Sequence, residues 1–444
     1  MVSLAPLNAG MIVGWISPIS LKLMADDSPV GVMTKEEISR LASCAFYALM
    51  VYAFALSYVS DKFGRKPALI MVGIPNIVSG TILTFATSKT WLYIGRTLSG
   101  LRSNGIFMSA MYLSEIADGS IRGMVITLCS VQINIGILVS YIAGKALSYK
   151  TFNAIMIVLP TIFSILMMWL PESPPYLLSK GKKKEAKKTL LWLRAGYEAA
   201  AQHELEAMKQ PNAAEAFIST ASFTRESFTE TFKTRGARRA LIISSLGFLL
   251  QMFSGINLIL SYAGIIFKEA GSPMTPEDSS IIVAVIILVS SIINLLVVDR
   301  LGRKPLLYVS YFLGAITMAT LSVFLYVQMI GVNVTDFRWI PIASIGVYVF
   351  SFAIGLSSIP GVIMNEVCSP IMKPTVLCVN TVSMVISISI VLQSFPYLDE
   401  YLGLYSTFVF PVFVNIFGLF FTWYMIPETK GKTLAQITCE LNRQ

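Results

Sequence analysis

Charged side chains occur twice in the same order along this chain. The hexapeptide Asp61-Lys62-Phe63-Gly64-Arg65-Lys66 returns 238 residues later (61 to 299) as Asp299-Arg300-Leu301-Gly302-Arg303-Lys304. Each copy lies between two long, uncharged apolar runs. Acids and arginines at the ends of neighbouring helices can form ion pairs that make and break as the helices move. The repeat therefore predicts a set of switchable ion pairs, present once in each half of the chain.

Other charged markers return in the same order. Glu115 and Arg122 are matched by Glu366 and Lys373, and a Pro-Glu pair at 171–172 by another at 427–428. We expect these charges to act as a latch between two states that differ by only a few kcal/mol. The alternative is that they are ordinary interfacial charges that fix helix ends. The candidate latch residues are Asp61, Arg65, Arg96, Glu115, Arg122 and Glu172 in the first half, and Asp299, Arg303, Glu366, Lys373 and Glu428 in the second.

Residues that could carry out catalysis are scarce. The chain has one histidine, His203, and it lies in a polar stretch between the two repeats. A catalytic centre needs a nucleophile, a base or a metal-ligand cluster, and no such constellation is visible. We therefore expect no enzymatic activity, no cofactor and no metal site.

The elements that position the charges are predicted to be membrane helices. A mean hydropathy of +0.69 with 13% charged residues leaves too little polar surface for a soluble protein of 444 residues. Lipid offers the backbone no hydrogen bonds, so runs of about 20 apolar residues must cross as helices. We predict about twelve: near 2–21, 41–60, 67–87, 91–114, 123–144, 151–171, 240–267, 279–298, 305–328, 339–365, 374–397 and 402–426.

These spans divide the chain into two six-helix bundles, so the predicted fold class is an all-α membrane protein. We place the N-terminal bundle at 1–171, a cytoplasmic helical linker domain at 172–239, the C-terminal bundle at 240–426 and a tail at 427–444. The linker contains KKKEAKKTLLWL and AAAQHELEAMK, which predict short amphipathic helices. The alternative is a solvated tether. Parallel repeats of this kind place a binding site between the two halves.

The distribution of charge predicts the orientation. The net charge of +9 does not indicate a nucleic-acid partner, because the basic residues gather in the hexapeptide loops and the linker, while the opposite loops carry mainly acids. By the positive-inside rule, both termini and the linker are cytoplasmic. Asn333-Val334-Thr335 is a glycosylation sequon in a loop predicted to lie outside. We expect a multi-pass protein of the plasma membrane, and the oligomeric state stays open.

The charged markers combine with further motifs into a recognisable set: Asp61 to Lys66, Gly95-Arg96, Glu115 to Arg122, Pro171-Glu172-Ser173-Pro174, Gln251 with Ser254-Gly255-Ile256-Asn257, and Pro427 to Gly431. With this set the chain resembles the sugar porter family of the major facilitator superfamily over essentially its whole length. The segment Gly10 to Trp15, followed by Ser17-Pro18, is most similar to insect facilitated trehalose and hexose transporters. The resemblance implies a sugar site near the middle of the membrane.

Sugar hydroxyls require side chains that both donate and accept hydrogen bonds, and polar groups at membrane depth are candidates for function. Gln132 matches a sugar-contacting glutamine of the family, and Gly255 would loosen its helix for gating. The alternative for each polar residue is a hydrogen bond between helices. The resemblance implies substrate binding by Gln132, Gln251, Ser254, Asn257 and Tyr262.

The chain departs from the family at several positions of the second half. Met252 stands where relatives have a second glutamine, and Ile287 replaces a polar residue. Gly361 replaces the tryptophan that usually follows Pro360, and Met384-Val385 replaces an Asn-Trp pair. In the cytoplasmic motifs, Pro175 and Lys373 replace arginines. Each hydrogen bond to a sugar that these changes remove is worth about 0.5 to 1.5 kcal/mol. Because more of the changes fall on the sugar site than on the charged motifs, the latch is better preserved than the sugar site.

Two functions remain open. The first is facilitative uniport of a hexose or a trehalose-like disaccharide by alternating access. Proton-driven relatives carry an acid in the first span, whereas this chain has no acid before Asp26, and a proton relay needs titratable groups inside the membrane. The second is a transport-inactive sugar sensor or paralogue with an altered substrate, which the changes in the second half favour.

Overall fold

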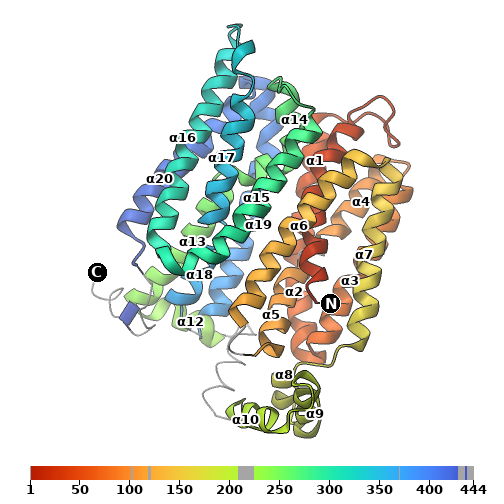
Figure 1. Cartoon of the computed structure of the whole chain (residues 1–444), viewed down its shortest axis with the longest axis vertical. Helices are drawn as coiled ribbons and strands as arrows, with labels where there is room; N and C mark the ends of the chain where they lie inside the picture. The colour runs from red at the N-terminus through yellow and green to blue at the C-terminus, as the bar shows by residue number, and fades with distance from the viewer. Residues whose placement is uncertain are drawn as a thin grey trace.

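The chain is a helical membrane protein of two bundles that lie side by side (Figure 1). The structure is a computed structural model, and it describes residues 2–101, 104–118, 122–208, 225–369, 371–428 and 436–437. Within these residues, eleven stretches are long and apolar enough to cross a membrane. Bulky apolar side chains such as Phe85 and Trp169 are about three-quarters exposed on the outer surface, at 72% and 73%. Such a surface is stable only against lipid.

The first bundle is built from seven helices that form six spans. Residues 91–114 were predicted as a single span, and the structure has α4 and α5 there. These two helices supply the crossing that completes twelve. Thr34 begins α2 with a capping box, since its side chain accepts from the Glu37 amide and the Glu37 carboxylate accepts from the Thr34 amide. The helices are α1 (Leu4–Leu23), α2 (Lys35–Phe63), α3 (Arg65–Phe85), α4 (Lys89–Gly100), α5 (Asn104–Ile116), α6 (Arg122–Ala146) and α7 (Tyr149–Trp169).

The second bundle has eight helices, because two of its six spans are broken. The first break separates α13 from α14 at Gly255, whose φ is +113°. Glycine adopts this φ readily, whereas it is unfavourable for other residues. The second break, at residues 355–358, separates α17 from α18. The helices are α13 (Arg235–Phe253), α14 (Ile256–Glu269), α15 (Pro276–Leu301), α16 (Arg303–Met329), α17 (Ile340–Ile354), α18 (Ile359–Val367), α19 (Lys373–Leu402) and α20 (Ser406–Tyr424).

The linker forms the predicted short helices: α8 (Pro174–Ser179), α9 (Lys183–Leu193), α10 (Glu198–Met208) and α12 (Arg225–Lys233). Helices α8 to α10 share a small apolar core around Leu177, Leu190 and Leu205. Arg194 forms two hydrogen bonds with Glu204, at 2.9 and 2.8 Å, and a third at 3.3 Å with the carbonyl of Ile116 at the end of α5. Residues 174–208 are therefore a packed unit attached to the first bundle rather than a solvated tether.

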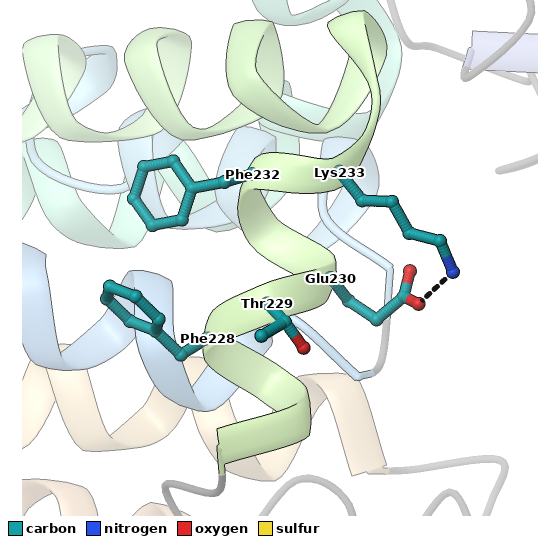
Figure 2. A pocket seen from close by; sticks show the side chains of 5 residues that line it. All are labelled: Phe228, Thr229, Glu230, Phe232 and Lys233. Carbon is teal, nitrogen blue, oxygen red and sulfur yellow. Dashed lines mark hydrogen bonds and ion pairs between the residues drawn. The ribbon is translucent and has the colours of Figure 1, made fainter.

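The last linker helix, α12, carries an aromatic pair. Figure 2 shows Phe228 and Phe232 on one side of α12, and the ion pair between Glu230 and Lys233 on another. The two rings lie 5.1 Å apart beside a cavity of about 600 Å³. The residues that line this cavity belong to α12, and the predicted sugar-binding residues are not among them.

Candidate functional site

The first hexapeptide joins α2 to α3, and the Glu172 carboxylate caps the N-terminus of α3. Its Oε1 accepts hydrogen bonds from the backbone amides of Arg65 and Lys66 at 2.9 and 3.2 Å. Gly64, which precedes α3, has no side chain to cap the helix, so a carboxylate from the end of the bundle does so. The φ of Gly64 is +118°, and a Cβ there would lie 2.2 Å from the Glu172 carboxylate. Glycine is required here for both reasons.

The guanidinium of Arg65 lies inside the same cluster. Its Nε donates to Glu115 Oε1 at 3.1 Å, and its Nη1 donates to the Ser60 carbonyl at 2.9 Å. Asp61 is a more distant partner, at 3.4 Å. The side chains of Arg65 and Glu115 are only 5% and 1% exposed, so this is a buried ion pair. Such a pair is costly to break, because one charge would then remain buried without its partner.

The second hexapeptide repeats this arrangement between α15 and α16. The Glu428 carboxylate accepts from the backbone amides of Arg303 and Lys304, both at 3.2 Å. Arg303 pairs with Glu366 at 3.1 Å, with side chains 13% and 26% exposed. The two clusters therefore have the same design, and the second is less deeply buried. We call the end of the molecule that carries both clusters the hexapeptide end.

The pairs described for these clusters each join residues of a single bundle. Arg65 with Glu115 and Arg303 with Glu366 hold neighbouring helices together, so the described pairs do not pass from one bundle to the other. Their predicted role as a latch stays a prediction. The side chains of Arg122 and Asp299 lie outside the described residues.

Arg96 was predicted to belong to the latch, but its described contacts are with residues outside the charge clusters. Its Nη1 donates to the Ile12 carbonyl at 3.2 Å, and its guanidinium lies 4.9 Å from the centre of the Trp15 ring. Arg96 is 3% exposed, so it is a buried cation between α4 and α1. Lys373 is half-buried at the beginning of α19.

The two bundles contact each other at the end opposite the hexapeptides. Lys35, at the start of α2, forms ion pairs with Glu269 at the end of α14 and with Asp399 near the end of α19. A second ion pair joins Lys145 of α6 to Asp278 of α15.

Closer to the centre, further hydrogen bonds join the bundles. The Tyr141 hydroxyl donates to the Leu260 carbonyl at 2.7 Å, and the Ser39 hydroxyl donates to the Leu392 carbonyl at 2.7 Å. Tyr141, Ser39 and Leu392 lie in the parts of their helices nearer this opposite end, and Leu260 lies near the start of α14, on the opposite-end side of the break at Gly255. The described cross-bundle contacts therefore close the opposite end.

Sequence reasoning missed these cross-bundle ion pairs. It recorded an excess of acids in the opposite loops, but it did not single out Lys35 or Lys145. The available signal was a lone lysine beside acids at the start of a span, as in Lys35-Glu36-Glu37.

Two of the predicted sugar-binding residues are occupied by contacts within the second bundle. The Ser254 hydroxyl donates to the Gln251 carbonyl and accepts from the Tyr348 hydroxyl, at 2.8 and 2.9 Å. Tyr262 is fully buried, stacks on Phe395 with ring centres 4.1 Å apart, and donates to the Leu392 carbonyl. In this conformation, both side chains stabilise the bundle.

Three other candidates keep hydrogen-bonding atoms available. Gln132 of α6 is half-buried, and its side chain has no hydrogen-bond partner within the described residues. Asn257 donates to the Met252 carbonyl at 3.2 Å. Gln251 donates to the Ser357 carbonyl at 3.2 Å, while its Oε1 is buried and unpaired among the described atoms. These amides can donate and accept toward a polyhydroxylated ligand.

The structure shows what surrounds the positions at which the chain departs from the family. Ile287 is 4% exposed within the apolar core, so its own side chain offers no hydrogen-bonding group at that position of α15. A Cβ built on Gly361 would meet no described heavy atom within 4 Å, so space remains where relatives carry a tryptophan. Asn333, in the predicted sequon, is exposed in the loop between α16 and α17, and Thr335 donates its amide to the Asn333 side chain at 3.0 Å.

Two membrane bundles of six spans each, with repeated charge clusters and closed against each other at one end, have the architecture of a secondary transporter. A family model described as "Sugar (and other) transporter" matches residues 11–441. The chain belongs to the sugar porter family of the major facilitator superfamily. This is a family of membrane transporters rather than enzymes.

Relatives and solved structures agree with this assignment. The facilitated trehalose transporter Tret1 of Apis mellifera ligustica is 30% identical, over 98% of this chain and 86% of that protein. The protein of the same name from Polypedilum vanderplanki is also 30% identical, with the same coverage of 98% and 86%. The fold is similar to the inward open conformation of the xylose transporter XylE from E. coli, with a TM-score of 0.80 and 20% identity, over 99% of this chain and 98% of that one.

Proposed function

We propose that this protein is a facilitative sugar transporter that works by alternating access, with a hexose or a trehalose-like disaccharide as substrate. The bundles would rock against each other about a site between them, exposing it first to one side of the membrane and then to the other. The substrate class rests on the family and on relatives whose names describe facilitated trehalose transport.

One observation carries the mechanism. The contacts described between the bundles gather at the end opposite the hexapeptides, whereas each hexapeptide cluster is held within its own bundle. Each bundle can therefore move as a unit while its cluster stays intact. With the hexapeptide end cytoplasmic, as the charge distribution favours, this conformation is closed to the outside and faces inward.

The amides that remain available support a sugar ligand. Gln132 comes from the first bundle, and Gln251 and Asn257 come from the second. A ligand that bonds to both bundles at once can lower the energy of an intermediate between the two states, which transport requires. Gating by the latch residues of both clusters belongs to the same proposal.

The charges of the spans support transport of the sugar without a coupled proton. Helix α1 contains no acid, and the acids Asp61, Glu115 and Glu366 near the hexapeptide end pair with arginines. Carboxylates held in this way are poorly suited to carry protons across the membrane. The concentration gradient of the sugar would then supply the driving force.

The remaining assignments belong to this proposal. Both termini and the linker face the cytoplasm, the membrane is the plasma membrane, and Asn333 carries a glycan on the outer face. The proposed domain boundaries are 171/172, 239/240 and 426/427, and the second of these falls inside α13, which begins at Arg235.

Uptake into cells that lack sugar transporters tests the function directly. Cells expressing the chain should take up labelled trehalose or glucose faster than cells with an empty vector, and the uptake should saturate. Saturable binding of either sugar without any flux would point to a sensor instead. Absence of both binding and flux would contradict the proposal.

A further inference from the structure

Two side-chain amides from different helices are fixed on the same break in the second bundle. Gln251 of α13 donates to the Ser357 carbonyl at 3.2 Å, and Asn294 of α15 donates to the Ser358 hydroxyl at 2.8 Å. Ser357 and Ser358 are consecutive residues between α17 and α18. Both amides are more than nine-tenths buried, with Gln251 8% and Asn294 6% exposed.

The oxygen atoms of these two amides lack partners. Gln251 Oε1 and Asn294 Oδ1 are each buried and without a hydrogen bond from any described group. Because the nitrogen of each amide is held by the break, the oxygen cannot turn toward another donor without losing that bond. Buried acceptors in native proteins are nearly always paired, so these two oxygens are available to accept hydrogen bonds from a ligand.

Space is present at the beginning of α18, directly after the break. Gly361 lies in the first turn of α18, and a Cβ built there would meet no described heavy atom within 4 Å. Gly247 lies one turn from Gln251 on α13, and a Cβ there would only touch Pro360, at 3.9 Å. Gly361 thus leaves room in the first turn after the break to which the amides are anchored.

The position of Asn294 lengthens the polar region. It lies seven residues after the apolar Ile287 on α15, which places it on the same helix face about 10 Å nearer the hexapeptide end. The Asn294 amide therefore lies about 10 Å from the level at which the family has its polar residue, a separation longer than one sugar ring.

We propose that Gln251, Asn294 and the space at Gly361 form a second sugar subsite at the α17–α18 break, which makes the protein selective for a disaccharide over a monosaccharide. This inference rests on the proposed function and names its substrate class. Gln251 Oε1 and Asn294 Oδ1 accept hydrogen bonds from two hydroxyls of the second ring, and the ring occupies the space beside Gly361. Asn294 is then a specificity-determining residue.

The test compares two sugars on the full-length protein in sealed liposomes. Uptake of labelled trehalose and labelled glucose is measured for the wild type, Asn294→Leu, Gly361→Trp and the control Ser290→Ala. Asn294→Leu keeps the branched shape and removes both the acceptor and the donor to Ser358, and Gly361→Trp fills the space without removing a hydrogen bond. Among the described residues, the Ser290 hydroxyl bonds to the Ile286 carbonyl of its own helix alone, so this control should leave uptake of both sugars unchanged.

We expect Asn294→Leu to raise the half-saturation concentration for trehalose about threefold to tenfold and to change that for glucose less than twofold. Gly361→Trp should abolish trehalose uptake and retain glucose uptake. Should Asn294→Leu fail to fold, Gly361→Trp decides alone. Equal effects on both sugars, or none, would overturn the subsite. A wild type that moves glucose and no trehalose would overturn the subsite and leave the proposed function standing, and a wild type that moves neither would overturn both.

Discussion

Lys35 Nζ of the first bundle lies 2.5 Å from Asp399 Oδ2 of the second. The same ammonium also pairs with Glu269, so one lysine holds two acids of the partner bundle. Because these contacts close the end opposite the hexapeptides, they stabilise one conformation and must separate before the other can form. The lysine therefore contributes to the balance between the two states.

Replacing Lys35 with alanine should shift this balance toward the state open at that end. A partly exposed pair is worth about 1 kcal/mol, which corresponds to about a fivefold change in the ratio of the two states. Spin labels at Val32 and Met274, exposed near this end on different bundles, would report a longer distance. Arg40→Ala is the control, because Arg40 pairs with Glu36 of its own helix. An unchanged distance distribution in Lys35→Ala would show that this pair does not set the balance.

The two hexapeptide glycines should respond unequally to substitution. Gly64 and Gly302 both have positive φ, which costs other residues about 1 to 3 kcal/mol. The added Cβ would lie 2.2 Å from the Glu172 carboxylate at position 64, and 3.2 Å from Glu428 at position 302. Gly64→Ala should therefore lower the melting temperature more than Gly302→Ala. Gly181→Ala controls for strain alone, since its φ is positive and its surroundings are open. Equal losses at 64 and 302 would contradict the close contact with Glu172.

Removing Arg65 should destabilise the first bundle. Glu115, 1% exposed, would be left as a buried carboxylate, at a cost of about 3 to 5 kcal/mol. Adding Glu115→Gln to Arg65→Ala should recover a large part of this loss, measured as thermal unfolding in detergent. Arg303→Ala should cost less, because its pair with Glu366 is more exposed. If the double variant is as unstable as Arg65→Ala, the ion pair is not the cause.

Alanine substitutions at Gln132 and Ser254 should distinguish a loss of sugar binding from a loss of stability. Gln132→Ala removes an amide that has no described partner, so it should raise the half-saturation concentration for sugar about twofold to tenfold and leave thermal unfolding unchanged. Ser254→Ala removes the acceptor of the Tyr348 hydroxyl, so it should lower stability and change half-saturation less than twofold. The concentration dependence of uptake distinguishes them. The reverse result would show that Ser254, rather than Gln132, contacts the sugar.

The sequence predicted the spans well because lipid imposes a simple requirement on them. Runs of about 20 apolar residues have few alternatives in a membrane. The segment 91–114 was correctly included despite Arg96, and the structure gives the reason: its guanidinium lies over the Trp15 ring and bonds to the Ile12 carbonyl. The break at Gly255 was signalled by the family motif. The break at 355–358 carried no signal of comparable strength.

The candidate site was harder to predict, because it depends on contacts between distant residues. The repeat singled out Arg65 and Glu115 as separate charged candidates, but spacing alone could not show that they pair with each other, or whether such pairs join one bundle or two. Likewise, the motif containing Ser254 resembles sugar-contacting sequences. Its hydroxyl is occupied only because Tyr348, 94 residues later, lies opposite it.

Steady-state uptake in sealed proteoliposomes tests passive sugar transport most directly. Labelled trehalose and glucose are supplied outside, with a proton or sodium gradient imposed or absent. The described acids near the hexapeptide end pair with arginines, so the sugar should equilibrate to the outside concentration at a protein-dependent rate, and collapsing either gradient should leave that rate unchanged. Accumulation above the outside concentration under either gradient, or a rate no faster than in protein-free liposomes, would contradict the account.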